Sequence, residues 1–232
     1  MYCSICGFKN SKFDVKCKSC GAYLQNPVYV LNLFDILSSL IFNPDEGFHK
    51  IIISKRKNFS IFLSSLSGIA ITFEIFRYAR AGEKYENLVF LFLNALYFGV
   101  PLGILFVLTM AIILKIFLYR FKGVGLRAYF AIVAYSMFPI ALSTFFLLPS
   151  ILAVFGIYYF TETPKANELK PLAFYIFSVT NWLLKVYSFF LLISGLKHIT
   201  ESFWKGLVFA ILTSICSFVL LNLLTEAIKI VL

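Results

Sequence analysis

The sequence predicts an all-α, polytopic membrane protein, a transmembrane helical bundle of about five spans preceded by a small cysteine-rich unit. Hydrophobic residues make up 60% of the 232 residues, and the mean hydropathy is +0.88, values typical of membrane helices. Five apolar runs are long enough to cross a bilayer, and the alternating ten-residue pattern of a membrane β-barrel does not recur. Lysines and arginines lie mostly at the edges of these runs, as in other membrane proteins.

Four cysteines near the N-terminus have the spacing of a metal-binding ribbon. Cys3 and Cys6 form one pair and Cys17 and Cys20 the other, in the pattern C-x2-C-x10-C-x2-C with a glycine after each pair. Four thiolates from two tight turns complete a tetrahedral site, and such a closed site is structural rather than catalytic. We therefore predict a zinc ribbon in which these cysteines bind a structural Zn²⁺. Two disulfides and a rubredoxin-like iron centre are the alternatives.

The chain is expected to divide into three segments. Residues 1–24 form the zinc ribbon, residues 25–58 a linker with amphipathic juxtamembrane helices, and residues 59–232 the five-span membrane domain. A helix over 28–42 has one apolar face and is expected to lie on the membrane or to pack under the spans. Asn43 then caps a second helix. The apolar face of the first helix consists of Val30, Leu33, Phe34, Leu37, Leu40 and Ile41.

The membrane domain contains five apolar runs, over residues 59–78, 88–119, 128–160, 172–196 and 203–231. Several are longer than the roughly 20 residues that cross a bilayer, so we expect tilted or kinked helices. Pro139 and Pro149 interrupt the third run, which leaves open one bent span or a span with a re-entrant stretch. Gly99 and Gly103 lie in the second run, where we favour close helix packing over a hinge.

The distribution of basic residues predicts the orientation. With the ribbon inside, the inner segments carry fourteen lysines and arginines beside the spans, and the outer segments carry six. Because such residues are retained on the cytoplasmic side, we expect the N-terminus in the cytoplasm and the C-terminus outside. A reducing cytoplasm favours zinc over disulfides. We interpret the formal charge of +10 as a topology signal and expect no nucleic-acid partner.

Basic residues before the first span are candidates for contact with lipid headgroups. Lys50, Lys55, Arg56 and Lys57 lie close together in the juxtamembrane segment. A basic residue near an anionic membrane surface contributes about 1 kcal/mol to binding. Retention of the segment in the cytoplasm explains the cluster equally well, so both interpretations stay open.

Two charged residues fall inside predicted spans. Glu74 lies toward the outer end of the first span, and Lys185 lies near the middle of the fourth. Charges inside a bilayer are rare and often functional. We favour the interpretation that Lys185 extends to the interface and that Glu74 lies at the outer interface beside Arg77. The alternative is an intramembrane Glu74–Lys185 pair in which each charge compensates the other.

Five short stretches carry a family resemblance through their order and spacing. They are residues 42–48 (Phe-Asn-Pro-Asp-Glu-Gly-Phe), 122–125 (Lys-Gly-Val-Gly), 134–139 (Ala-Tyr-Ser-Met-Phe-Pro), 192–198 (Leu-Ile-Ser-Gly-Leu-Lys-His) and 204–206 (Trp-Lys-Gly). The chain from about Leu31 onward resembles the Yip family of five-span membrane proteins, named for interaction with small Rab-type GTPases. It is most similar to the prokaryotic branch. An N-terminal zinc ribbon before the membrane domain is similar to arrangements in members of that branch. The resemblance implies a prokaryotic cytoplasmic membrane and a role in membrane organisation or trafficking.

The resemblance has one limit that bears on partners. The eukaryotic branch carries an Asp-Leu-Tyr-Gly-Pro stretch in its cytosolic segment, and this sequence contains no counterpart. Binding of a Rab-type GTPase is therefore not transferred to this chain.

The sequence offers no recognisable catalytic constellation. It has no Ser/His/Asp arrangement, no H-E-x-x-H motif and no phosphate-binding glycine loop. We therefore predict a non-enzymatic scaffold or adaptor that lies in the lipid bilayer and docks a protein partner through its cytosolic ribbon. The alternative is an oligomeric permease for small solutes or ions that uses polar residues within the spans, and a homo-oligomer is compatible with either function. An enzyme acting on lipids ranks last.

Overall fold

The computed structural model describes residues 1–232 except 12, 27, 29, 86, 120–123 and 232. Four residues used in the sequence analysis lie outside the described residues. They are Lys12, Arg120 and Lys122, which were counted among the basic residues that predict the orientation, and Gly123 of the stretch 122–125. The helical elements are α1 (Leu33–Phe42), α2 (Pro44–Ile53), α3 (Ser60–Tyr78), η1 (Ala81–Glu83), α4 (Leu88–Phe117), α5 (Leu126–Ser136), α6 (Phe138–Ser143), α7 (Leu147–Phe155), η2 (Gly156–Phe160), α8 (Ala166–Leu169), α9 (Pro171–Thr200) and α10 (Phe203–Val231).

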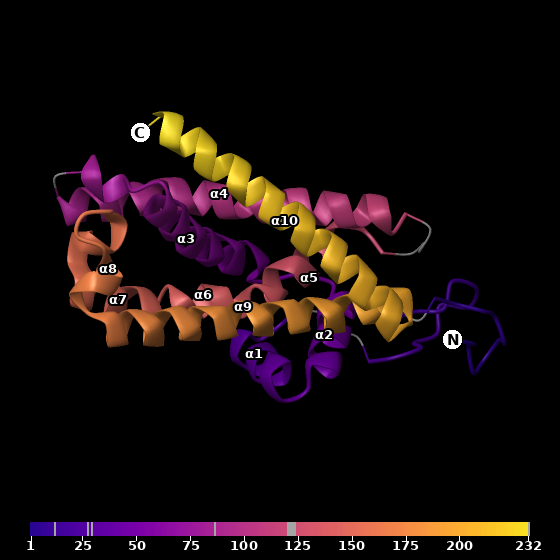
Figure 1. The fold of residues 1–232 in the computed structure, drawn as a ribbon. Coiled ribbons are helices and arrows are strands. Elements are labelled where there is room, and N and C mark those ends of the chain that lie inside the picture. The colour runs from indigo at the N-terminus through magenta and orange to yellow at the C-terminus, as the bar shows by residue number, and fades with distance from the viewer. Residues whose placement is uncertain (12, 27, 29, 86, 120–123, 232) are drawn as a thin grey trace.

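Within the part of the chain that the structure describes, five helical segments are long and apolar enough to cross a membrane, which confirms the predicted fold class. They are Ser60–Tyr78, Leu88–Phe117, Phe138–Phe160, Pro171–Thr200 and Phe203–Ile230. In Figure 1 the N-terminal ribbon and the turn between α9 and α10 lie at one end of the bundle. The C-terminus and α8 lie at the opposite end.

The third run consists of short helices rather than one long helix. Helices α5 and α6 are separated at Met137, and α6 and α7 are separated at residues 144–146. Pro139 and Pro149 lie in the first turns of α6 and α7. A proline there removes no helical hydrogen bond, because the first N–H groups of a helix have no acceptor within it.

This broken run crosses the bundle once, parallel to α3. The Tyr135 hydroxyl donates to the Asn58 carbonyl, just before α3, at 2.5 Å. Further along, the Ser67 hydroxyl donates to the Met137 carbonyl at 3.2 Å. Beyond the end of α3, Gly82 packs against the backbone around Ile157. The Thr144 hydroxyl donates to the Leu66 carbonyl, beside Ser67, so α6 runs across the middle of α3. From Tyr135 to Ile157 the run advances from the start of α3 to beyond its end, and the chain does not turn back.

The juxtamembrane helices α1 and α2 pack under the spans and share their hydrophobic core. Leu40 of α1 and Phe48 of α2 are fully buried in one cluster with Tyr129 of α5 and Leu191 of α9. Asn43 caps α2, since its side chain accepts a hydrogen bond from the backbone N–H of Glu46.

The apolar face expected for the first juxtamembrane helix is wrong in part. Ile36 and Leu40 are buried, whereas Phe34 and Ile41 of the expected face are 83% and 49% exposed. The helix begins only at Leu33, after the Asn32 cap, and Ile36 rather than Phe34 completes the buried stripe. Helix α1 therefore carries two apolar faces, one packed against the protein and one directed outward, as expected for a helix that contacts lipid.

Glycines bring α3 and α4 into backbone contact. A methyl group on Gly68 would lie 2.3 Å from the Gly103 Cα, and one on Gly103 would lie 2.1 Å from the Ser64 carbonyl oxygen. A methyl group on Gly99 would lie 2.8 Å from the Ile69 Cα. Close packing through small residues is a main source of helix association in membranes, and these distances confirm that interpretation of Gly99 and Gly103.

The α3–α4 contact predicts that Gly103→Ala destabilises the protein. Alanine favours a helix by about 1 kcal/mol over glycine, but overpacking against backbone costs about 1–3 kcal/mol. We therefore expect a lower midpoint of thermal unfolding in detergent micelles. Gly125→Ala is the matched control, because nothing lies within 4 Å of a methyl group there. A Gly103→Ala protein at least as stable as wild type would contradict the packing argument.

Candidate functional site

The four N-terminal cysteines converge on one point. All four sulfurs lie within 4.8 Å of one another, with 3.7 Å between Cys3 and Cys20 and 3.5 Å between Cys6 and Cys17. Sulfurs bound to a tetrahedral ion at about 2.3 Å stand roughly 3.8 Å apart. The residues therefore fit a single metal ion. Because Cys6 and Cys20 are exposed, the site suits a structural ion better than a buried redox centre.

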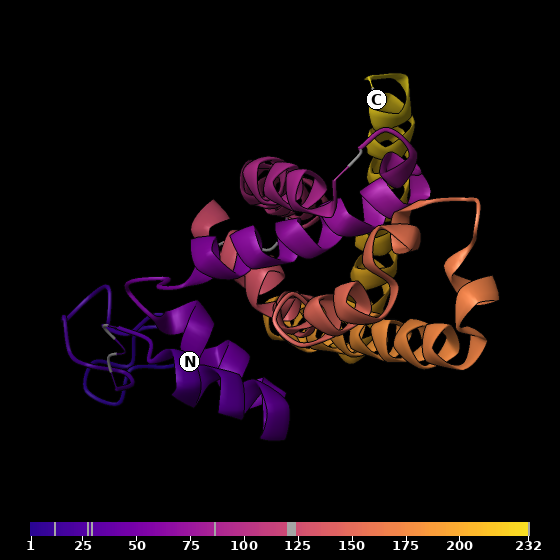
Figure 2. The ribbon, with the colours of Figure 1, turned by 90° about the vertical axis from the view of Figure 1, so that its left-hand side faces the viewer.

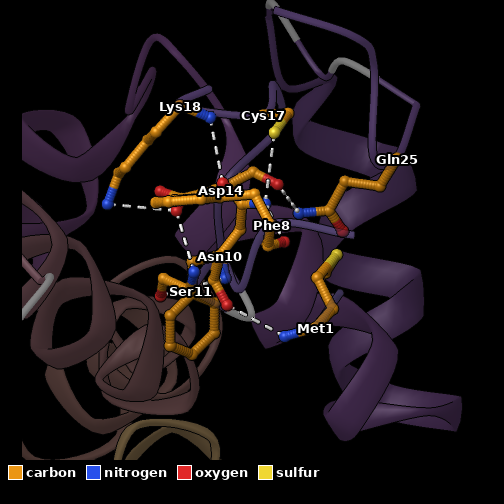
Figure 3. A network of polar contacts seen from close by, with 9 residues as sticks. Met1, Phe8, Asn10, Ser11, Asp14, Cys17, Lys18 and Gln25 are labelled. Carbon is orange, nitrogen blue, oxygen red and sulfur yellow. Dashed lines mark hydrogen bonds and ion pairs between the residues drawn. The ribbon is translucent and has the colours of Figure 1, made fainter. Parts of the chain in front are cut away.

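Local backbone geometry and one asparagine organise the thiols. Gly7 and Gly21 have φ angles of +68° and +73°, a conformation that glycine adopts at little cost. The Asn10 amide donates to the Cys17 sulfur at 3.4 Å, and its oxygen accepts from the backbone N–H of Lys18 at 2.9 Å (Figure 3). The backbone N–H of Cys20, together with the Asn10 amide, lowers the pKa of Cys17 to about 6 despite some desolvation. Sequence reasoning did not single out Asn10.

The structure brings Glu74 and Lys185 into direct contact. The Lys185 ammonium lies 2.7 Å from Glu74 Oε1 and 2.8 Å from Oε2. Asn181, one turn earlier on α9, donates to Glu74 Oε1 at 2.6 Å. Both carboxylate oxygens therefore accept hydrogen bonds, which is how a charge inside a membrane protein is accommodated. The two side chains come from helices more than 100 residues apart in the sequence.

A cavity of about 340 Å³ lies beside this cluster. Its lining comes from α3, α4, α5, α6, α7, η2, α9 and α10, and is mainly apolar. Its polar residues include Glu74, Lys185, Asn181 and Tyr159, together with Ser214 and Ser217 of α10. Figure 2 shows how α3, α9 and α10 cross around this part of the bundle.

A second polar cluster joins α2 to α9 near the ribbon. Asp45 Oδ1 accepts from the Ser194 hydroxyl at 2.8 Å, and Oδ2 accepts from the Lys197 ammonium at 2.7 Å. His198 lies 3.7 Å from Asp45, and its ring centroid is 6.2 Å from that of His49. The two histidines are distant in sequence, but the structure makes them neighbours. The contacts of Asp45 also bring together two of the stretches that carry the family resemblance, residues 42–48 and 192–198.

The four basic juxtamembrane residues occupy different environments. Lys55 and Arg56 are exposed, and Lys50 pairs with Glu46 at 2.8 Å. Lys57 instead turns back to the end of α2, where its ammonium donates to the carbonyls of Ile51, Ile52 and Ser54. Burial lowers the pKa of Lys57 to about 8.

The Asp45 contacts predict a pH-dependent contribution to stability. Partial burial opposes ionisation, but the hydrogen bonds from Lys197 and Ser194 outweigh it and hold the Asp45 pKa below its ordinary value of 3.8. The stabilisation should therefore be complete above pH 3.8 and be lost as the pH falls through the lowered pKa. Asp45→Asn should destabilise the protein by up to about 1 kcal/mol at pH 7, with no difference from wild type near pH 2.

Chemical unfolding of both proteins at the two pH values measures this effect. Glu226→Gln serves as the control, since Glu226 forms only an exposed pair with Lys229 one turn along α10. A constant difference between Asp45→Asn and wild type at both pH values would refute the assignment of the stabilisation to the ionised carboxylate.

Comparison with known proteins gives one family assignment. The model of the Yip1 domain family matches residues 38–225, whereas comparisons with curated proteins and with solved structures found no match. The matched region begins within α1 and ends within α10, so it includes α2, four of the apolar segments, most of the fifth and the Asp45 cluster. Since the match covers well over half of the sequence, the chain belongs to the Yip1 domain family.

Proposed function

We propose that the protein is a non-enzymatic membrane adaptor whose N-terminal zinc ribbon docks a protein partner. In this proposal it resides in a prokaryotic cytoplasmic membrane, with the ribbon in the cytoplasm and the C-terminus outside. The helical membrane domain anchors the chain in the bilayer. The exposed residues Lys55 and Arg56, and the outward face of α1, contact lipid.

The surface of the ribbon is the observation that carries this proposal. At the tip of the first knuckle, the Ile5 side chain is 76% exposed, and nearby Tyr2 is 69% exposed. The exposed lysines Lys9, Lys16 and Lys18 lie in the same small unit. Lys18 is paired with Asp14, whereas Lys9 and Lys16 add positive charge to the unit. Apolar groups that a folded unit leaves in water, beside polar or charged side chains, are typical of an interaction surface. The partner that fits is an acidic protein segment with apolar side chains.

A structural zinc ion explains how such a short ribbon is rigid enough to recognise a partner. About 24 residues cannot bury enough apolar surface to fold alone, and metal coordination supplies the missing free energy. The tetrathiolate geometry supports this assignment, because structural zinc sites have four ligands and no open position.

A permease that transports a small solute is the second candidate. The polar cluster around Glu74 and Lys185 beside a cavity within the spans supports it, since charges at such depth often mark a substrate path. Homo-oligomerisation fits both candidates.

Replacing Cys3 and Cys6 by serine should release the metal. We expect the purified wild-type protein to contain one equivalent of zinc by elemental mass spectrometry, and the double variant to contain none. Limited proteolysis should then cleave the variant within the first 24 residues while the membrane domain stays intact. Cys216→Ser, which changes the isolated cysteine of α10, should retain the metal. One equivalent of zinc in the double variant would disprove the four-thiolate site.

Removal of the Ile5 side chain should abolish partner capture. We expect the full chain to retain a partner from gently solubilised membranes, and a chain starting at Asn26 or an Ile5→Ser variant to lose it. Ser19 occupies the matching position in the second knuckle, so Ser19→Ala is the control and should retain the partner. Zinc content must be equal in both point variants. Identical profiles from the full chain and the chain starting at Asn26 would reject the adaptor.

A further inference from the structure

We propose that the cavity between α3, α9 and α10 binds the anionic head of an amphiphile, a carboxylate or phosphate group attached to an alkyl chain. The proposal concerns the membrane domain alone and does not depend on the ribbon acting as a docking unit. Four observations carry it: the supply of hydrogen-bond donors, the local charge, the position of the cluster and the apolar remainder of the cavity.

Several hydrogen-bond donors at the cavity remain after the protein's own contacts. An ammonium has three donors and an amide two. Lys185 and Asn181 use three of these on Glu74, which leaves one N–H of each side chain. Among the described residues, the hydroxyls of Ser214 and Ser217, which can donate or accept, have no hydrogen-bond partner although both line the cavity. Carboxylate and phosphate oxygens are the strongest acceptors for the remaining N–H groups.

The hydroxyl of Tyr159 adds a further donor. Its oxygen accepts a hydrogen bond from the Arg77 guanidinium at 3.1 Å, so its proton is free to point elsewhere. Arg77 is held between the rings of Tyr159 and Phe174, 4.9 and 5.2 Å from their centroids. Of these charged groups only Lys185 and Glu74 line the cavity, and their charges balance. Arg77 adds a positive charge behind the Tyr159 hydroxyl, so an anionic head is favoured over a cationic one.

The Lys185 ammonium is only partly compensated by the protein. Its side chain is 41% exposed, and exposure within a span means contact with lipid or with the cavity rather than with bulk water. Because a single carboxylate covers one side of the ammonium, an anionic ligand on the other side would complete its hydrogen bonds. Such charge-assisted bonds are about twice as strong as neutral ones.

On α3 the cluster lies near the end of the span, although Lys185 lies midway along the longer helix α9. Arg77 is in the last turn of α3, and Glu74 lies three residues, about 4.5 Å, further in along the helix. From there the cavity continues between apolar side chains such as Phe218 and Leu221 of α10. An alkyl chain attached to the anionic head would lie along these residues, since apolar walls with a few convergent polar groups are typical of small-molecule sites.

Binding of defined amphiphiles to the full chain in phosphatidylcholine nanodiscs tests the proposal. The probes share a twelve-carbon chain and differ in the head: dodecanoate, dodecyl phosphate, dodecanol and dodecyltrimethylammonium. We expect the two anions to raise the midpoint of thermal unfolding, as any ligand selective for the folded state does, and the neutral and cationic probes to leave it unchanged. Discs doped with phosphatidylglycerol show whether a phospholipid headgroup serves as the anion or only a free amphiphile does.

Variants connect the effect to the named groups. Lys185→Met alone would leave Glu74 unpaired, so the decisive variant is Glu74→Gln/Lys185→Met, which carries no net change in charge. It should bind dodecanoate about tenfold more weakly, the effect expected when charge-assisted hydrogen bonds are lost. Ser214→Ala/Ser217→Ala keeps the ion pair and should weaken binding to a smaller degree. Lys205→Met, at an exposed position outside the cavity, is the control and should bind as wild type.

Two results would overturn the proposal. Equal stabilisation by dodecanol and dodecanoate would show an apolar groove without recognition of the head. Unchanged dodecanoate binding in Glu74→Gln/Lys185→Met would place the anion elsewhere. If this variant does not fold, the serine variant decides, because unchanged binding there removes the donor argument. Loss of the ribbon partner in the Ile5→Ser variant would affect none of these results, so the two proposals fail separately.

Discussion

Helix α3 is the structural constraint on which the rest of the membrane domain depends. About two thirds of its apolar span is buried inside the protein, against a third or less for each of the other four segments. Its backbone touches α4 at Gly68 and Gly103, and its polar groups meet the broken third run through Ser67. At its far end Glu74 meets Lys185 of α9. Any shift of α3 would therefore disturb all three neighbours at once.

The glycine contact has a direct consequence for the polar cluster. Without a hydrophobic driving force between helices, association in a bilayer depends on close packing and on hydrogen bonds. The α3–α4 contact supplies the packing, and it fixes the rotation of α3 so that Glu74 points toward α9. The charge pair then supplies the hydrogen bonds on the opposite side. The short helix α3, of 19 residues, thus packs closely on one face and makes polar contacts on the other.

The sequence predicted the fold class and the convergence of the four N-terminal cysteines because both depend on local patterns. Length and apolar composition define a span, and two C-x2-C pairs define a tetrathiolate site. The sequence could not decide whether Glu74 and Lys185 form a pair or lie separately at the interface. The answer depends on how far α9 is displaced along α3. For the same reason the sequence did not place His49 beside His198, or Ser214 and Ser217 at the same cavity as Lys185. The apolar face of α1 was misjudged because the helix has two apolar stripes.

Helix α9 links the two ends of the molecule through two polar clamps. Asn181 and Lys185 bind the carboxylate of α3, and Ser194 and Lys197 bind the carboxylate of α2. Lys185 and Lys197 are twelve residues apart, roughly 18 Å along the helix. In both clamps a lysine and a neutral donor of α9 share one acidic side chain.

The two clamps differ in what surrounds them, and this difference separates their roles. The Asp45 clamp joins α2, on which the ribbon segment rests through the contact of Gln25 with His49, to the core containing Phe48 and Leu191. The polar groups of the Asp45 clamp hold α2 and α9 together. The Glu74 clamp borders a cavity and a row of hydroxyls that no described residue engages. An arrangement needed only for stability would fill that space with apolar side chains, because buried polar groups without partners cost free energy. The cavity beside this charge pair is therefore the part of the membrane domain best suited to a ligand.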